Sequence, residues 1–219
     1  MASEVDISNL ALGHLGDNAT VASLEPPEGS AQAEHCARFY PIARDSLLEM
    51  HHWNFATKRV QLAALDNPWP QWQHAYAKPA DCLNIISVID PEAPDDYATI
   101  TGYNPNRTPL LGSFVVPQRY VVETNEAGAG VILTNQEDAV LRYTAQVTDT
   151  TKFSPLFVMA LTHHLASMLA GPILKGEAGQ VEGKRQTQLM MGYLGKAASS
   201  DSNQRKVDPV HNVGWIQGR

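Results

Sequence analysis

Two pairs of adjacent histidines are the residues of this sequence best suited to bind a metal ion. They are His51-His52 and His163-His164. Neighbouring side chains on a helix point about 100° apart, so one pair cannot grip a single ion as residues four positions apart can. The sequence identifies no third ligand, and His163 is better interpreted as a hydrogen-bonded core or interface histidine. We therefore expect no metal site, and no motif points to another cofactor.

A glycine-rich segment at residues 176–185 resembles a phosphate-binding loop only faintly. Such a loop has four residues between its glycines and a Ser or Thr after its Lys, which cradle phosphate and hold magnesium. Here three residues separate Gly179 from Gly183, and Arg185 follows Lys184. No predicted strand leads into the segment, so we interpret it as a flexible junction between two helices.

The sequence also lacks the signatures of common hydrolases. It contains no Gly-x-Ser-x-Gly elbow and no His-Glu-x-x-His motif. Its carboxylates between residues 81 and 138 include no pair marked as acid and base. An aromatic set could form a ligand platform, although a packed junction between helices and a β domain is favoured. Its members are Trp53, Phe55, Trp69, Trp72 and Tyr76. We expect that the protein is not an enzyme.

The composition supports a folded chain with an uneven distribution of charge. The 219 residues are 43% hydrophobic and 18% charged, which is ample material for a core. The net charge of −7 argues against a dedicated DNA-binding domain. Residues 61–150 carry four basic and eleven acidic side chains, whereas residues 151–219 carry eight and four. This division suits ends that meet different partners, and chance variation on a solvated surface explains it equally well.

Cysteine usage and the N-terminal residues indicate a cytoplasmic origin. Cys36 and Cys82 are best interpreted as buried apolar thiols, since the sequence cannot show whether they lie close enough to pair. The first six residues have no basic or apolar region of a secretory signal. No stretch approaches the 18 apolar residues of a membrane span, so we expect no contact with a membrane.

The pattern of apolar residues predicts helices at both ends of the chain and strands between them. Ser3 and Ser30 are expected to cap helices over residues 3–15 and 30–50, the second kinked at Pro41. An extended segment over 56–62 and a Pro/Trp-rich connector over 66–74 follow. Ser154 and Pro155 begin a buried helix that ends or kinks at Gly171-Pro172. The expected strands are 83–89, 97–101, 113–116, 120–124, 131–134 and 141–147, and the later helices are 154–174 and 177–198.

This order of elements predicts an α+β fold in which a helical bundle built from both ends of the chain holds an inserted antiparallel β domain. The expected segments are the first half of the bundle at 1–74, the β-rich insert at 75–150, the second half at 151–198, and an extended C-terminal arm at 199–219. The arm begins with a polar spacer and ends with apolar residues that it cannot bury on itself. These residues are predicted to dock on a partner: Val207, Val210, Val213, Trp215 and Ile216.

Six strings of residues occur in an order that resembles one known family. They are ALGHLG at 11–16, ARFYPIARDSLL at 37–48, HWNFATKR at 52–59, YAKPADCL at 76–83, LRY at 141–143, and DTTKFSPLF at 149–157 before an Ala-rich helix. Together they resemble the tail tubular protein A family of short-tailed phages and prophages. The resemblance covers about residues 7–198, and no family string matches residues 199–219.

The resemblance implies a head-to-tail adaptor of the virion neck, assembled in the host cytoplasm. Such proteins form a ring of about twelve copies between the portal and the tail nozzle, a tail tubular protein B-like partner, and the genome passes through the ring. The family's fold is a helical bundle plus a β-rich domain, with a C-terminal arm that reaches the portal or a neighbouring subunit. The family has no catalytic residues to transfer. An acidic lumen would repel the phosphates of passing double-stranded DNA. The alternatives are a head-completion or stopper protein of another tail type, and a small-ligand-binding domain.

Overall fold

A computed structural model of the chain describes residues 2–92 and 118–204, and it divides the chain into two compact units. The helical unit comprises the residues up to Thr57 together with Thr144–Gln204, and the β unit comprises Lys58–Tyr143. The predicted α+β class is confirmed: helices come from both ends of the chain, and two antiparallel sheets lie between them in the sequence.

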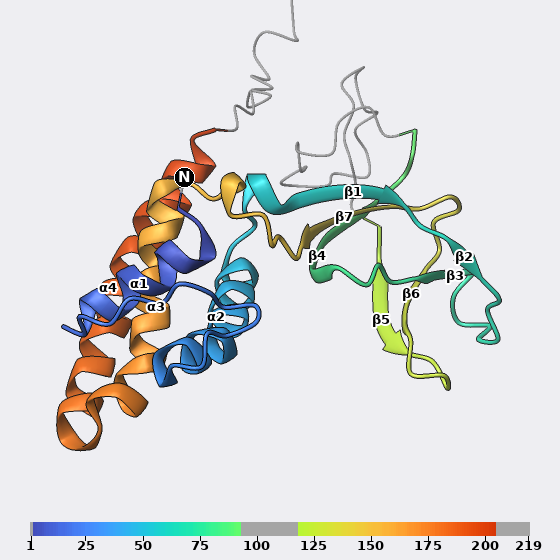
Figure 1. Cartoon of the computed structure of the whole chain (residues 1–219). Helices are drawn as coiled ribbons and strands as arrows, with labels where there is room; N and C mark the ends of the chain where they lie inside the picture. Colours follow the sequence, from blue (N-terminus) through green and yellow to red (C-terminus); the bar gives the residue numbers. More distant parts are fainter. Residues whose placement is uncertain (1, 93–117, 205–219) are drawn as a thin grey trace, which may run out of the picture. The chain divides into compact units, whose positions relative to one another are not determined.

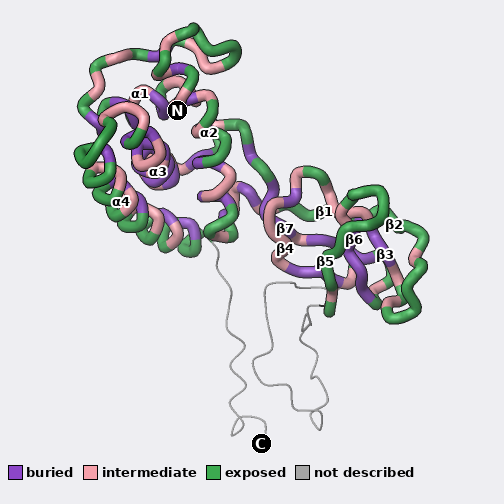
Figure 2. The backbone as a smooth tube through the Cα atoms, turned by 90° about the horizontal axis from the view of Figure 1, so that it is seen from below, coloured by how far each residue is buried: buried purple, intermediate pink, exposed green. Residues whose placement is uncertain are grey.

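The helical unit is organised around one central helix, α3. Its four α-helices are α1 (Glu4–His14), α2 (Ala31–Met50), α3 (Pro155–Leu174) and α4 (Gly176–Ser202). Short 3-10 turns, η1 (Asn54–Ala56) and η2 (Thr150–Lys152), lie beside the chain's passages to and from the β unit. α3 contacts each of the other three helices, and α2 and α4 lie on opposite sides of it (Figures 1 and 2).

Serine caps begin three of the four helices at the expected positions. The Ser3 hydroxyl accepts from the amide of Asp6, whose carboxylate accepts from the Ser3 amide in return. Ser30 caps α2 and Ser154 caps α3 in the same way, each through the amide three residues on. A side-chain oxygen here satisfies an amide that has no partner within the helix. The predicted single helix over 30–50 is confirmed, because α2 continues through Pro41.

α3 is the core helix of this unit. Its length of 20 residues and mean hydropathy of 1.4 would suffice for a membrane span by composition alone, contrary to the interpretation from the sequence. Half of this apolar stretch of α3 is buried, and four of its side chains are fully enclosed: Phe157, Leu161, Leu165 and Leu169. A helix that is apolar on all sides suits a position surrounded by three others. α3 also passes Gly171-Pro172 and ends only at Leu174.

The described part of the β unit contains seven strands in two sheets. One sheet has the order β1-β7-β4, and the other has the order β2-β3-β6-β5 (Figure 1). Ala75, Val131 and Leu133 form a buried cluster of the second sheet, with Trp72 packed against it. The strands expected at 97–101 and 113–116 lie outside the described residues. The strand bounds are β1 (Thr57–Gln61), β2 (Ala64–Leu65), β3 (His74–Ala77), β4 (Cys82–Ile89), β5 (Tyr120–Thr124), β6 (Gly130–Thr134) and β7 (Val140–Ala145).

The division between the units differs from the expected boundaries at residues 74 and 150. It falls at Thr57 and Lys58 on the way out of the helical unit, and at Tyr143 and Thr144 on the way back. The reason is strand pairing, since β1 hydrogen-bonds to β7 and β2 to β3, which ties residues 58–74 to the sheets. The Pro/Trp-rich segment is therefore a connection within the β unit, between β2 and β3.

The last helix is longer than expected. α4 includes residues 199–202, which the sequence assigned to the C-terminal arm. The polar residues there extend the helix because its final turn is fixed by hydrogen bonds from another element, described below. Asn203 and Gln204 form a turn after α4, and residues 205–219 of the predicted arm lie outside the described residues.

Candidate functional site

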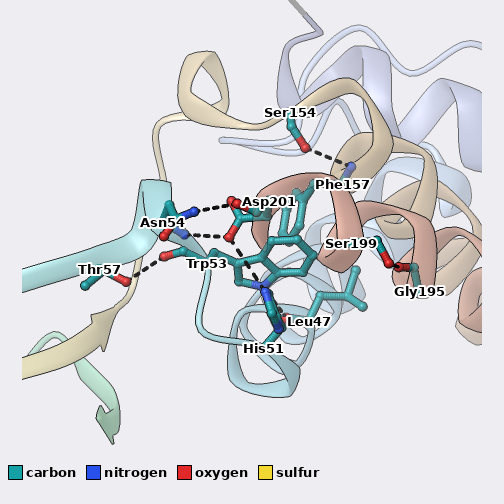
Figure 3. Close-up of polar contacts among 10 residues, drawn as sticks. All are labelled: Leu47, His51, Trp53, Asn54, Thr57, Ser154, Phe157, Gly195, Ser199 and Asp201. Atoms are coloured by element: carbon teal, nitrogen blue, oxygen red, sulfur yellow. Dashed lines mark hydrogen bonds and ion pairs between the residues drawn. The ribbon is translucent and has the colours of Figure 1, made fainter. Parts of the chain in front are cut away.

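The five residues predicted to bind a partner, Val207, Val210, Val213, Trp215 and Ile216, lie outside the described residues. The described chain ends at Gln204, so the candidate site is the support from which this segment continues. We name it the Asp201 anchor, and it consists of His51, Trp53, Asn54 and Asp201, all in the helical unit (Figure 3).

Two hydrogen bonds join the last turn of α4 to the segment after α2. The amide of Asn54 donates to Oδ2 of Asp201 at 3.0 Å, and Nδ2 of Asn54 donates to the Asp201 carbonyl oxygen at 2.6 Å (Figure 3). One residue of the chain's first quarter thus holds both the side chain and the main chain of α4's end. Asp201 is only 7% exposed, so water competes little for these bonds.

Trp53 is the packed floor of the anchor. Its ring is fully buried, and its Nε1 donates to the Leu47 carbonyl oxygen at 2.9 Å, which orients the indole. It packs edge-on against Phe157 with ring centroids 5.0 Å apart, and Phe55 and Phe153 extend the cluster. Such a cluster gives the hydrogen-bonding residues above it a rigid base.

The electrostatics of the anchor are unusual for a helix end. A carboxylate near a helix C-terminus faces the negative end of the helix dipole, which disfavours it. The charge-assisted bond from the Asn54 amide offsets that cost. His51 lies nearby with its Nε2 3.6 Å from Oδ2 of Asp201, beyond hydrogen-bonding distance, and this nitrogen has no hydrogen-bond partner in the described structure. The anchor can therefore fix the start of the C-terminal segment.

Sequence reasoning missed this site. From the sequence, Asp201 is only a charge in the polar spacer, and Asn54 is only part of the string at 52–59. The sequence offered no signal for it, because Asp201 lies beyond the predicted helix at 177–198 and only the structure places it in the last turn of α4.

His163 and His164 have different partners, as helix geometry requires for neighbours on α3. His163 is stacked between His14 and Tyr193, and its Nδ1 lies 2.6 Å from Oε1 of Gln186. His164 instead meets Ser46, with Nε2 2.9 Å from the hydroxyl oxygen. The prediction of a hydrogen-bonded core histidine is confirmed for His163. The described residues bring no three His, Cys, Asp or Glu side chains together at a metal-binding distance.

The glycine-rich segment packs helices together. α3 leads into it where a phosphate loop requires a strand, and Lys175 alone separates α3 from α4. Gly179 and Gly183 lie inside α4, where a Cβ atom on Gly179 would come within 2.7 Å of the Ala170 carbonyl oxygen. The expected flexible junction is therefore wrong for these two positions, because their missing side chains let α4 approach α3 closely.

The five residues of the aromatic set are divided between the two units, so neither unit contains the whole set. Trp53 and Phe55 belong to the helical unit, whereas Trp69, Trp72 and Tyr76 belong to the β unit. Trp69 is 55% exposed, while Tyr76 is buried and its hydroxyl donates to the Gln136 carbonyl oxygen.

Both cysteines are free and buried, as expected. Cys36 lies in the helical unit and Cys82 in the β unit. Burial raises the pKa of the Cys36 thiol to about 11, so this thiol stays protonated and unreactive near neutral pH.

Comparison with known proteins identifies no family for this chain: no family model matches it, and no curated protein is detectably related.

Proposed function

We propose that the protein is a non-enzymatic head-to-tail adaptor of a short-tailed phage or prophage. It would form a ring of about twelve copies between the portal and the tail nozzle, with double-stranded DNA passing through the centre. The observation that supports this most is the architecture, a bundle made from both ends of the chain with an inserted antiparallel β unit. It agrees with the fold that the resemblance implies.

The Asp201 anchor adds a physical reason for the C-terminal segment to act as an arm. Fixing one end of a segment reduces the entropy that it loses on docking, because fewer conformations remain to be given up. Fifteen residues follow Gln204, and an extended chain of that length spans at most about 50 Å. The apolar side chains of the segment would then bind a groove of the portal: Val207, Val210, Val213, Trp215 and Ile216.

The test is a binding measurement with a purified portal ring from the phage or prophage that encodes the chain. Sedimentation of mixtures would compare the full chain with a variant that lacks residues 207–219. We expect the deletion to weaken binding by more than about tenfold, roughly 1.4 kcal/mol, with an unchanged melting temperature. Trp215→Ala alone should account for a large share of the loss. Unchanged affinity of the truncated chain for the portal would refute the arm.

Self-association offers a second measurement. The net charge of −7 makes copies repel one another until a template concentrates them. At micromolar concentration we expect the isolated chain to sediment as a monomer and to assemble only on the portal ring. A stable large ring without the portal would contradict this assembly route. Averaged images of virions, which place the protein at the neck or elsewhere, would separate an adaptor from a stopper protein of another tail type.

A further inference from the structure

The outward side of α4 carries a partly apolar and positively charged surface. Val181 and Met191 are each 61% exposed, and Lys184, Arg185 and Lys196 are exposed beside them. The carboxylates near these cations are the exposed Glu177 and the partly buried Glu182, whose Oε1 lies 3.1 Å from Nη1 of Arg185. We name the surface around Val181 and Met191 the α4 face. Two large apolar side chains so open to water on one helix mark a surface that a partner can cover.

A second surface of this kind lies on α2. Ile42 and Met50 are 55% and 52% exposed, and the exposed charges on this helix are Glu34, Arg38 and Glu49. We name the surface around Ile42 and Met50 the α2 face. It has the opposite net charge to the α4 face, since two exposed carboxylates outweigh one guanidinium here, and three cations outweigh the carboxylates of Glu177 and Glu182 there.

These two faces lie on opposite sides of the helical unit. α2 and α4 both pack on α3, from opposite directions, as both views of the bundle show (Figures 1 and 2). Complementary surfaces on opposite sides of one subunit suit a head-to-tail contact, in which each copy uses its α4 face on one neighbour and its α2 face on the other. Repeating such a contact builds a ring when the rotation closes.

We propose that the α4 face of one copy binds the α2 face of the next copy of this chain. This inference rests on the proposed ring and names the surfaces that join its subunits. Met191 and Val181 would pack against Ile42 and Met50, while the cations of α4 face the carboxylates of α2. The opposite charges orient the encounter and disfavour contacts between two α4 faces or two α2 faces.

Two glycines on the α4 face agree with this contact. Gly192 and Gly195 are exposed, and a Cβ atom added at either position would meet nothing within 4 Å. A glycine inside a helix is less favourable than alanine, and nothing in the described chain compensates for this here. A helix of the neighbouring copy could compensate for it by packing closely against the α4 backbone at these two glycines.

The experiment uses the full chain alone, concentrated to about 1 mM, where a contact of a few kcal/mol becomes visible. Sedimentation equilibrium would compare the wild type, Met191→Glu on the α4 face and Ile42→Lys on the α2 face. Each substitution adds a charge of the same sign as the face that it would meet. Leu10→Glu is the matched control, because Leu10 is 46% exposed on α1 and lies on neither face.

We expect the wild type and Leu10→Glu to associate, and each of the two variants alone to associate at least about tenfold more weakly. An equimolar mixture of the two variants should associate again, because each supplies the face that the other lacks. In the remaining contact of the mixture, the carboxylate introduced on the α4 face would meet the ammonium group introduced on the α2 face. A wild type that stays monomeric at about 1 mM, a single variant that associates normally, or a mixture that does not recover would each overturn the proposal.

Portal binding, measured separately, distinguishes this inference from the proposed function. A chain that binds a portal ring but fails the mixing test loses only the contact between the α4 and α2 faces. If the chain passes the mixing test but does not bind the portal ring, the contact between the two faces stands and the adaptor role is refuted.

Discussion

Replacing Asp201 with alanine should destabilise the helical unit by about 0.5–2 kcal/mol. The substitution removes the acceptor of the Asn54 amide, a hydrogen bond to a charged group worth about 1.5–3 kcal/mol. Two gains reduce this loss. A carboxylate leaves the unfavourable end of the α4 dipole, and alanine has the better helix propensity, each worth about 0.5 kcal/mol. The second bond, from Asn54 Nδ2 to the Asp201 carbonyl oxygen, survives in the variant.

Urea unfolding followed by tryptophan fluorescence measures the difference, because Trp53 belongs to the anchor and is fully buried. Asp201→Asn keeps an acceptor oxygen without the charge, so it should fall between the wild type and Asp201→Ala. The control is Ser199→Ala, two residues before Asp201, which removes an exposed hydroxyl that donates to the Gly195 carbonyl oxygen. It should change the free energy of unfolding by less than about 0.5 kcal/mol.

The reasoning would be wrong if Asp201→Ala proved as stable as the wild type. That result would mean that the dipole and propensity gains cancel the hydrogen bond, and that Asn54 does not hold α4 in place. A loss equal to that of Ser199→Ala would lead to the same conclusion.

Three further predictions follow from α4 and the buried histidines. Gly179→Ala should destabilise the protein by about 1–3 kcal/mol, because its Cβ atom would lie 2.7 Å from the Ala170 carbonyl oxygen; thermal melting checks this. In the same helix Gly192→Ala should stabilise by up to about 1 kcal/mol, since its Cβ atom meets nothing, and a lower melting temperature would contradict it. Burial lowers the pKa of His164, and burial followed by nearby positive charge lowers that of His14, so both bind protons more weakly when folded. Stability should therefore be complete above the unfolded pKa of about 6.5 and fall as the pH drops through the folded values, and His164→Gln should flatten this slope in denaturation curves at about pH 7.5 and 5.

Local signals account for the parts of the fold that the sequence predicted well. Ser3, Ser30 and Ser154 each precede a helical pattern of apolar residues, and all three form the expected caps. These features depend on neighbours within a few residues, so a linear pattern reveals them. The Pro/Trp-rich segment misled the assignment of the boundary, since the pairing of β1 with β7 joins residues more than seventy positions apart.

The candidate site was beyond prediction for the same reason. Asn54 and Asp201 are separated by 147 positions, and neither residue type is rare or part of a motif. The α2 and α4 faces also required the structure, because the apolar stripe of a helix does not reveal which of its residues remain exposed after packing. The docking residues 207–216 remain a prediction from the sequence.

The adjacency of β1 and β7 has a consequence for the order of folding. The two halves of the bundle are separated by roughly 85 residues of β unit, and closing a flexible loop of that length costs about 4 kcal/mol. Pairing β1 with β7 brings the chain's exit from the first half beside its return to the second half. If the β unit folds first, the entropy cost of closing this loop is already met when the bundle assembles. α3 could then dock on α1 and α2 almost as if the two halves of the bundle were joined directly. The inserted sheets would thus speed assembly of the bundle by holding its two halves close together. Substitutions that prevent early folding of the β unit should therefore slow the folding of the helical unit as well.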